Sequence, residues 1–252
     1  RTRNLYKPNE EKPYKLSRSK VENFVSCKRC FFIDRKLGVG QPDGFPFNIN
    51  IAVDDLLKKE FDSFREKNEP HPYMNETNRN LIPFKHEMID EWRSMNKGVQ
   101  YHDTKTNFIL YGAVDDLWFD LDSDEVIVAD YKATAKYSDV SIDEEWQGGY
   151  RRQMDFYQWL LRKNGFKVSN SGFFVYCNGD KNKEYFDNKV HFKVSILEYV
   201  GNTDWIEGTI TEIKELAHLS AKASREEAVY TTLVGMMAWQ TAETSARCQR
   251  FQ

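Results

Sequence analysis

Features of several protein classes are missing from this 252-residue sequence, and each absence narrows its interpretation. No apolar run approaches the roughly 18 residues that a membrane-spanning helix needs, so we expect no membrane segment. The first residues are polar and show no apolar core of a signal peptide, so we expect no secretory leader. Four cysteines are too few for a disulfide scaffold, which favours a reducing, cytoplasmic location.

Motifs of other chemistries are also missing. The sequence contains no glycine-rich phosphate-binding loop, so we expect no nucleotide-driven motor. The five histidines show no H-x-x-x-H spacing and favour structural or surface roles. What is present is an ordinary globular composition, with 30% charged and 14% aromatic residues. This composition can build a sizeable core in one large domain or in a domain with a subdomain.

The charge is distributed unevenly, although the whole chain carries only −3. Residues 1–36 contain eleven Lys and Arg against four acids, a balance of +7 that leaves −10 for the remainder. A basic segment on an acidic body can hold a polyanion near a site that itself needs carboxylates. The same pattern suits a solvated helix with scattered charge, so charge alone leaves both interpretations open.

Hydrophobic periodicity predicts a mixed α/β chain in the order three helices, a hairpin, a helix, a hairpin and a helix. The expected helices are 17–37, 51–66, 83–95, 146–164 and 202–219, and the expected strands are 107–119, 125–133, 172–177 and 189–200. The expected organisation is a basic flexible arm (1–16), an N-terminal helical subdomain (17–100), an α/β core (101–221) and an atypical C-terminal tail (222–252).

Two acids and a lysine are expected on one face of the first hairpin. If its turn is centred between Asp122 and Ser123, Asp115 lies directly opposite Asp130. Opposed residues have Cβ atoms about 4.5–5.5 Å apart, and like charges there are destabilising unless a cation neutralises them. Lys132 emerges on the same face, two residues beyond Asp130. The group suits Mg²⁺ or Mn²⁺ and attack of water on a phosphate; the alternative is an exposed face with a salt bridge.

The helix after this hairpin adds polar side chains to the same region. Gln153 and Tyr157 are four residues apart and therefore share a helix face. Arg151 and Arg152 add positive charge that suits a phosphate backbone. Without the hairpin, the glutamine and the tyrosine would be interpreted as ordinary helix surface and core edge.

Three motifs occur in a characteristic order: G-x-V-D at 112–115, D-Y-K at 130–132 and Q-x-x-x-Y at 153–157. In these motifs the chain resembles the PD-(D/E)XK nuclease superfamily, and most closely its RecB-like branch, which includes CRISPR-associated exonucleases. The sequence C-K-R at 27–29, followed by two phenylalanines, is similar to the N-terminal helix of that branch. The resemblance covers residues 17–220 and implies a restriction-endonuclease-like core, with a mixed sheet of about four to five strands flanked by helices.

The resemblance implies a role for each matching residue in metal-dependent hydrolysis of DNA. Asp115 and Asp130 would bind Mg²⁺ or Mn²⁺ together with the main-chain carbonyl of Tyr131. Lys132 would be the catalytic lysine. The glutamine and the tyrosine of the third motif would position DNA and the active-site water. The implied substrates are DNA ends or single strands.

Four basic residues are the candidates for holding DNA: Lys28, Arg29, Arg151 and Arg152. The chain departs from the RecB-like pattern at an upstream helix, where that branch places a metal-binding histidine. Here the aligned residue is Asp54, which would either bind a metal through oxygen or be an exposed helix acid.

The cysteines depart from a second RecB-like pattern. Some RecB-like nucleases hold a [4Fe–4S] cluster with one N-terminal cysteine and three near the C-terminus. The candidates here would be Cys27 and Cys248, because the tail supplies one cysteine and C-x-x-C occurs once. A cluster needs four converging thiolates, so the spacing favours buried or incidental cysteines over a cluster.

Two alternatives to an exonuclease stay open from the residues alone. The first is a catalytically inactive DNA-binding or assembly module of the same fold, which the missing histidine and the atypical tail motivate. The second is a restriction-type endonuclease, which would cut circular DNA into defined fragments.

Overall fold

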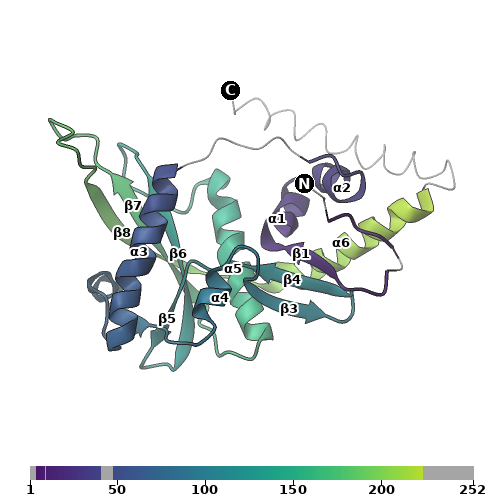
Figure 1. Cartoon of the computed structure of the whole chain (residues 1–252), viewed down its shortest axis with the longest axis horizontal. Coiled ribbons are helices and arrows are strands. Elements are labelled where there is room, and N and C mark those ends of the chain that lie inside the picture. Colours follow the sequence, from purple (N-terminus) through teal and green to yellow (C-terminus); the bar gives the residue numbers. More distant parts are fainter. Residues whose placement is uncertain (1–3, 9, 41–47, 224–252) are drawn as a thin grey trace.

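The computed structural model describes residues 4–8, 10–40 and 48–223, which form an α/β structure with two sheets (Figure 1). The strands are β1 (Tyr14–Ser17), β2 (Leu81–Pro83), β3 (Val99–Asp103), β4 (Phe108–Gly112), β5 (Asp116–Asp120), β6 (Glu125–Thr134), β7 (Ser171–Gly179) and β8 (Phe192–Val200). The helices are α1 (Arg18–Ser26), α2 (Lys28–Lys36), α3 (Asn48–Lys67), α4 (Ile89–Arg93), α5 (Gly148–Lys163) and α6 (Asp204–Ala223), with short 3₁₀ helices η1 (Pro72–Thr77) and η2 (Glu145–Gln147). None of the described helices has the length and apolar character that a bilayer crossing needs.

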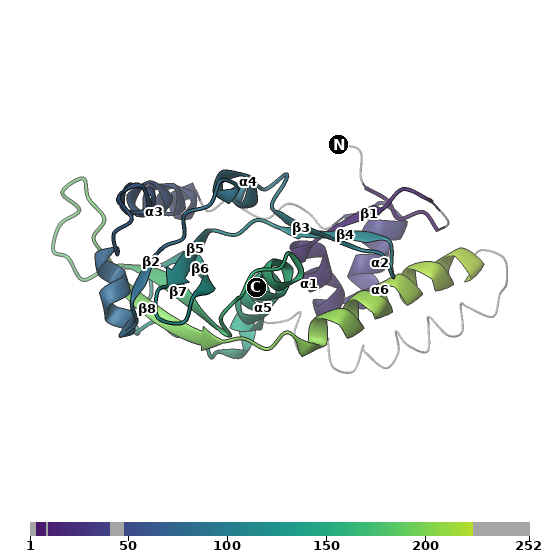
Figure 2. The same cartoon turned by 90° about the horizontal axis from the view of Figure 1, so that it is seen from below.

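The larger sheet has five strands in the order β2-β5-β6-β7-β8; its β6–β7 pair is parallel and its other pairs are antiparallel. The smaller sheet has the order β1-β4-β3, with β1 parallel to β4. Helices α1, α2 and α6 gather beside the smaller sheet, whereas α3 lies along the larger one (Figures 1 and 2). The expected mixed sheet of about four to five strands flanked by helices is confirmed, and the smaller sheet is an addition that the sequence did not indicate.

Helices cover both faces of the larger sheet because side chains along β6 alternate between the faces. Ala129 and Tyr131 pack with Phe61 of α3 in one buried cluster. Val128 packs with Phe156 of α5 in the other. Even-numbered positions of β6 therefore face α5, and odd-numbered positions face α3.

The register of the first hairpin agrees with the sequence-based prediction. Asp116 pairs with Ala129 at one end of the β5–β6 ladder, and Asp120 pairs with Glu125 at the other. This pairing centres the turn between residues 122 and 123, as expected. The position of every side chain on this hairpin follows from that register, because the strand period is two.

The sequence predicted one continuous strand over residues 107–119, and this prediction is wrong, because the segment forms two strands. Residues 113–115 leave β4 in the smaller sheet and enter β5 in the larger one. The main-chain N of Val114 donates to the main-chain O of Trp92 at 3.1 Å, which ties this passage to α4. Asp115 consequently lies just before the first ladder pair of β5.

The expected single helix 17–37 is two helices. Cys27 separates α1 from α2 with φ −160° and ψ 93°, an extended conformation. Its Sγ accepts a hydrogen bond from the main-chain N of Cys30 at 3.1 Å and so caps α2. A disulfide also joins these two cysteines. An interruption of one residue does not change the spacing of apolar residues, so the periodicity predicted a single helix.

The expected helix 83–95 is wrong in its first half. Pro83 is the last residue of β2, the edge strand of the larger sheet, and pairs with Trp118. An edge strand tolerates proline, because one side of its main chain needs no ladder partner. The helical part is the short α4, which buries Ile89 and Trp92.

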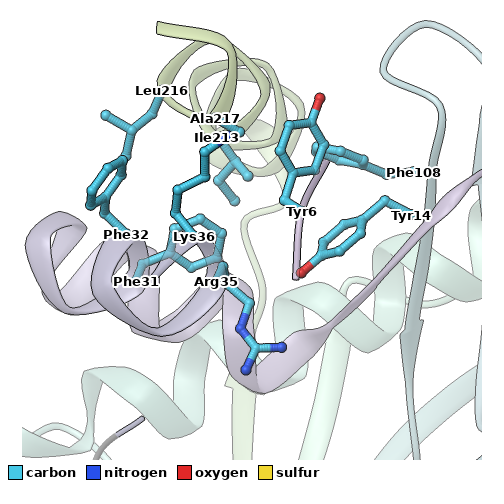
Figure 3. Close-up of a pocket in the computed structure, with 10 residues that line it drawn as sticks. All are labelled: Tyr6, Tyr14, Phe31, Phe32, Arg35, Lys36, Phe108, Ile213, Leu216 and Ala217. Atoms are coloured by element: carbon cyan, nitrogen blue, oxygen red, sulfur yellow. The ribbon is translucent and has the colours of Figure 1, made fainter. Parts of the chain in front are cut away.

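The N-terminal segment, which was expected to be a flexible arm, packs against the rest of the described structure at Tyr6. This residue is buried, and its main-chain N donates to the main-chain O of Arg35 in α2 at 2.9 Å. Its ring lies between α2, α6 and β4 and meets Tyr14 edge-on, with 5.3 Å between ring centres (Figure 3). The cavity left among these groups is about 10 Å³, which is close to the minimum for one water.

Candidate active site

The first hairpin brings two acids and a lysine together. Asp130 is fully buried in β6, and Lys132 forms an ion pair with its Oδ2. Asp115 accepts a hydrogen bond from the main-chain N of Tyr131 at 3.0 Å through its own Oδ2. The carboxylate of Asp115 is close enough for its charge to act on the pKa of Asp130. The break before β5 therefore places Asp115 beside the buried pair.

This cluster has too little positive charge for its carboxylates. Burial and then the charge of Asp115 raise the pKa of Asp130 to about 7, against the lowering effect of Lys132. Burial alone lowers the pKa of Lys132, but Asp130 and Asp115 outweigh it and raise that pKa to about 12. Both pKa values rise because one ammonium group faces two carboxylates. The positive charge of Lys132 is therefore fully compensated, whereas the negative charge of Asp130 is not.

The partners of Asp130 leave its charge incompletely compensated. Its buried Oδ2 meets the ammonium group of Lys132, which also acts on Asp115, and its Oδ1 accepts from Gln153 at 2.9 Å. Two neighbouring carboxylates that share one ammonium group are costly unless a further cation meets them. Asp115 and Asp130 fit Mg²⁺ or Mn²⁺, since proteins often hold such ions by one or two carboxylates plus water and substrate phosphates. Within the described ranges no three Asp, Glu, His or Cys are spaced to hold an ion, so the chain would supply these two.

Helix α5 contributes the glutamine and the tyrosine of the third motif. Gln153 donates through Nε2 to Asp130 and also to the hydroxyl of Tyr157 at 3.2 Å. Burial raises the pKa of Tyr157 to about 12, so its hydroxyl stays neutral. A Cβ on Gly112 would lie 2.6 Å from Cε1 of Tyr157, so the glycine of the G-x-V-D motif lets this ring approach β4.

Helix α3 places Asp54 next to this cluster. Lys58, one turn further along, donates to Oδ2 of Asp54 at 2.6 Å, and its Nζ lies 4.0 Å from Oδ1 of Asp115. Burial and then the charge of Asp115 raise the pKa of Asp54. Lys58 was not among the residues predicted for the site, although its spacing of four residues from Asp54 was a usable signal.

A second buried charged cluster surrounds Asp116 and was also missed. The fully buried Asp116 pairs with Arg65 of α3 and with Arg93 of α4, the latter at 2.7 Å. It also accepts a hydrogen bond from the hydroxyl of Tyr131 at 2.7 Å. Nε of Arg93 donates to the main-chain O of Asp115 at 3.1 Å, so this cluster supports the passage on which Asp115 lies. No local pattern in the sequence connects these arginines with the hairpin.

The four basic residues expected to hold DNA are not part of this cluster. Arg152 donates to Glu22 of α1 at 2.6 and 2.9 Å, and Arg151 donates to main-chain oxygens of the preceding loop. Lys28 pairs with an acid of α6 at 2.6 Å, and Arg29 is exposed on α2. Three of the four therefore already have partners within the chain.

Of the two candidate iron–sulfur ligands, the structure describes only Cys27. Cys27 is bonded to Cys30, and a cysteine in a disulfide has no thiolate to offer a cluster. Cys248 lies outside the described residues, as do residues 224–252 of the expected tail. Cys177 is buried in β7 as a free thiol, and burial raises its pKa to about 11.

Comparison with curated proteins finds no match to this chain. A family model described as the PD-(D/E)XK nuclease superfamily matches residues 15–249, which include both acids, the lysine and the third motif. Together with the mixed sheets flanked by helices, this match confirms the expected restriction-endonuclease-like α/β fold. The chain belongs to the PD-(D/E)XK nuclease superfamily.

Proposed function

We propose that this protein is a Mg²⁺- or Mn²⁺-dependent deoxyribonuclease of the RecB-like kind, which hydrolyses phosphodiester bonds at DNA ends or in single strands. The observation that carries the proposal is the fully buried Asp130, whose ammonium partner Lys132 is shared with the neighbouring carboxylate of Asp115. A divalent ion would supply the positive charge that the two acids lack and relieve the repulsion between them. Membership in a nuclease superfamily adds independent support.

Asp115, Asp130 and the main-chain carbonyl of Tyr131 would hold the ion. When bound, the ion supplies neutralising charge for a phosphodiester and acidifies water. The chain fixes both carboxylates in advance. The main-chain N of Tyr131 holds Asp115, and Gln153 holds Asp130. Such preorganisation avoids a cost of reorientation during the reaction.

Lys132 would act as a cation and not as a base. Its raised pKa, about 12, keeps the ammonium group protonated at neutral pH. The ammonium group lies 4.7 Å from the centre of the Tyr150 ring, which helps to hold the side chain. From there it would donate a hydrogen bond to the attacking water or to a phosphoryl oxygen, and stabilise the charge that develops.

Gln153 and Tyr157 would position the water and the DNA strand. The amide of Gln153 links the hydroxyl of Tyr157 to Asp130, so the three groups are held as a unit. Because the raised pKa of Tyr157 keeps its hydroxyl neutral, that group can donate its proton in a hydrogen bond. Arg29, with Lys28, Arg151 and Arg152, would hold the backbone with little reading of bases.

The second candidate function is a DNA-binding or assembly module of this fold without catalysis. It is favoured by Lys58, which lies within 4.0 Å of both Asp54 and Asp115 where a further metal-binding side chain was expected. A restriction-type endonuclease would use the same site on internal positions of DNA.

The test is incubation with linear single-stranded, linear double-stranded and circular DNA, in Mn²⁺ or in EDTA. We expect shortening of linear DNA in Mn²⁺ and none in EDTA. Lys132→Met should abolish it, while Lys136→Met, just beyond β6 and paired with Glu144, should leave it unchanged. A mobility shift without cleavage would instead support the inactive module, and defined fragments from the circle would support an endonuclease.

A further inference from the structure

We propose that the ammonium group of Lys58 fills the second cation position of this site, so that the protein binds one divalent ion and not two. The proposal rests on the proposed nuclease function and says which cations that site uses. Lys58 donates to Asp54 at 2.6 Å and lies 4.0 Å from Oδ1 of Asp115. It therefore occupies the space in which these two carboxylates would share an ion.

The position of this ammonium group is set by the packing of α3. Asp54 and Lys58 are one turn apart and share a helix face. The neighbouring Leu57 and Phe61 are buried against the larger sheet, in the cluster that also contains Tyr131. Because Tyr131 in turn holds Asp115 through its main-chain N, the helix and the hairpin are fixed relative to each other.

The balance of charge also favours one ion. Asp54, Asp115 and Asp130 present three carboxylates, and Lys58 and Lys132 present two ammonium groups, which leaves one uncompensated negative charge. A single divalent ion and one DNA phosphodiester would bring the cluster to neutrality. A second divalent ion would leave two excess positive charges and would have to displace Lys58 from Asp54.

The spacing of the acids agrees with this assignment. Among the described residues no three acidic, histidine or cysteine side chains are placed to hold an ion, so Asp54 does not join Asp115 and Asp130 as a ligand set. Lys58 instead acts as a positioning residue. Its charge compensates Asp54 and part of that of Asp115, which leaves Asp115 and Asp130 as the two carboxylates for the ion.

The test is to count the Mn²⁺ ions bound by the full chain, using titration calorimetry and the electron paramagnetic resonance signal of free Mn²⁺. We expect one ion for the wild type. Lys58→Met, which keeps the length of the side chain and removes its charge, should bind two. Lys58→Arg and Lys58→Met combined with Asp54→Asn should each bind one. Lys59→Met is the matched control, because Lys59 is exposed on the same helix and should leave the count at one.

Two results would overturn the proposal: two ions bound by the wild type, or one ion bound by a folded Lys58→Met variant with unchanged affinity. Circular dichroism and thermal melting establish that the variant is folded, and its partly exposed position makes the substitution tolerable. A wild type that binds no Mn²⁺ and cuts no DNA contradicts the proposed function itself. Failure of the function is thus distinguishable from failure of the ion count.

Discussion

Asp115 and Asp116 are consecutive residues, but their carboxylates enter different charged clusters. Asp116 meets two guanidinium groups and the hydroxyl of Tyr131, so its negative charge is well compensated. Asp115 meets a main-chain N–H, the ammonium group of Lys58 at 4.0 Å and the carboxylate of Asp130. The cluster around Asp116 has enough positive charge for its buried carboxylate, whereas the cluster of Asp115 and Asp130 has too little.

We interpret the difference as that between a structural role for the Asp116 cluster and a functional role for Asp115 and Asp130. A buried charge with good partners can be kept at little net cost and fixes a local geometry, as the Asp116 cluster does for the passage before β5. A buried carboxylate whose charge is incompletely compensated is unfavourable for folding and is often retained at sites that meet a ligand. Asp130 is such a carboxylate, because burial and Asp115 raise its pKa to about 7 in spite of Lys132.

The largest expected effect is on catalysis by Asp130→Asn. The substitution removes one of the two carboxylates that we propose hold the ion, so cleavage of linear DNA in Mn²⁺ should fall by about 10³-fold or more. The melting temperature should not fall, since repulsion with Asp115 disappears. Asp122→Asn, in the exposed turn of the same hairpin, should cut at the wild-type rate. Equal rates for Asp130→Asn and the wild type would show that the cluster of Asp115 and Asp130 is not the active site.

The next effect is on stability, and it concerns the other cluster. Arg93→Ala leaves the buried Asp116 with one guanidinium partner and should lower the free energy of unfolding by about 3–5 kcal/mol. Urea denaturation measures it. The control is Lys97→Ala, which breaks an exposed pair with Glu91 and should cost about 0–1 kcal/mol. Equal losses for the two variants would show that the Asp116 cluster is not special.

A smaller effect is expected in the pH dependence of stability without metal. The pKa of Asp130 rises from 3.8 to about 7 on folding, so the folded state binds the proton more tightly. Its contribution to stability is therefore present below pH 4 and is lost as the pH rises through about 7. In EDTA, the wild type should lose stability relative to Asp130→Asn over this range. A difference that stays constant with pH would argue against a raised pKa.

The smallest expected effect is stabilisation by the ion alone. Binding to the folded state at a hundredfold excess over Kd contributes about 2.7 kcal/mol, which raises the melting temperature by several degrees. Mn²⁺ should produce this shift in the wild type and not in Asp130→Asn. Asp116 is not a ligand here, so a folded Asp116→Asn variant should retain a shift. Loss of the shift in the Asp116 variant alone would reverse the assignment of the two clusters.

The sequence predicted the hairpin and missed its surroundings for physical reasons. Strand period and turn position determine register, so the pairing of Asp116 with Ala129 followed from counting residues. The break before Asp115 did not, because it reflects a passage between two sheets and not a local breaker. Lys58 and Arg93 come from helices whose placement on the hairpin depends on tertiary packing. Cys27 interrupts a helix that apolar spacing alone had indicated as continuous.

The most direct measurement is the rate at which Lys132→Ala and the wild type shorten the same end-labelled linear DNA in Mn²⁺. We expect rapid, EDTA-sensitive shortening by the wild type and none by the folded variant, because Lys132 is the ammonium group paired with Asp130. Equal rates for the two proteins would contradict the assignment of this hairpin as the active site.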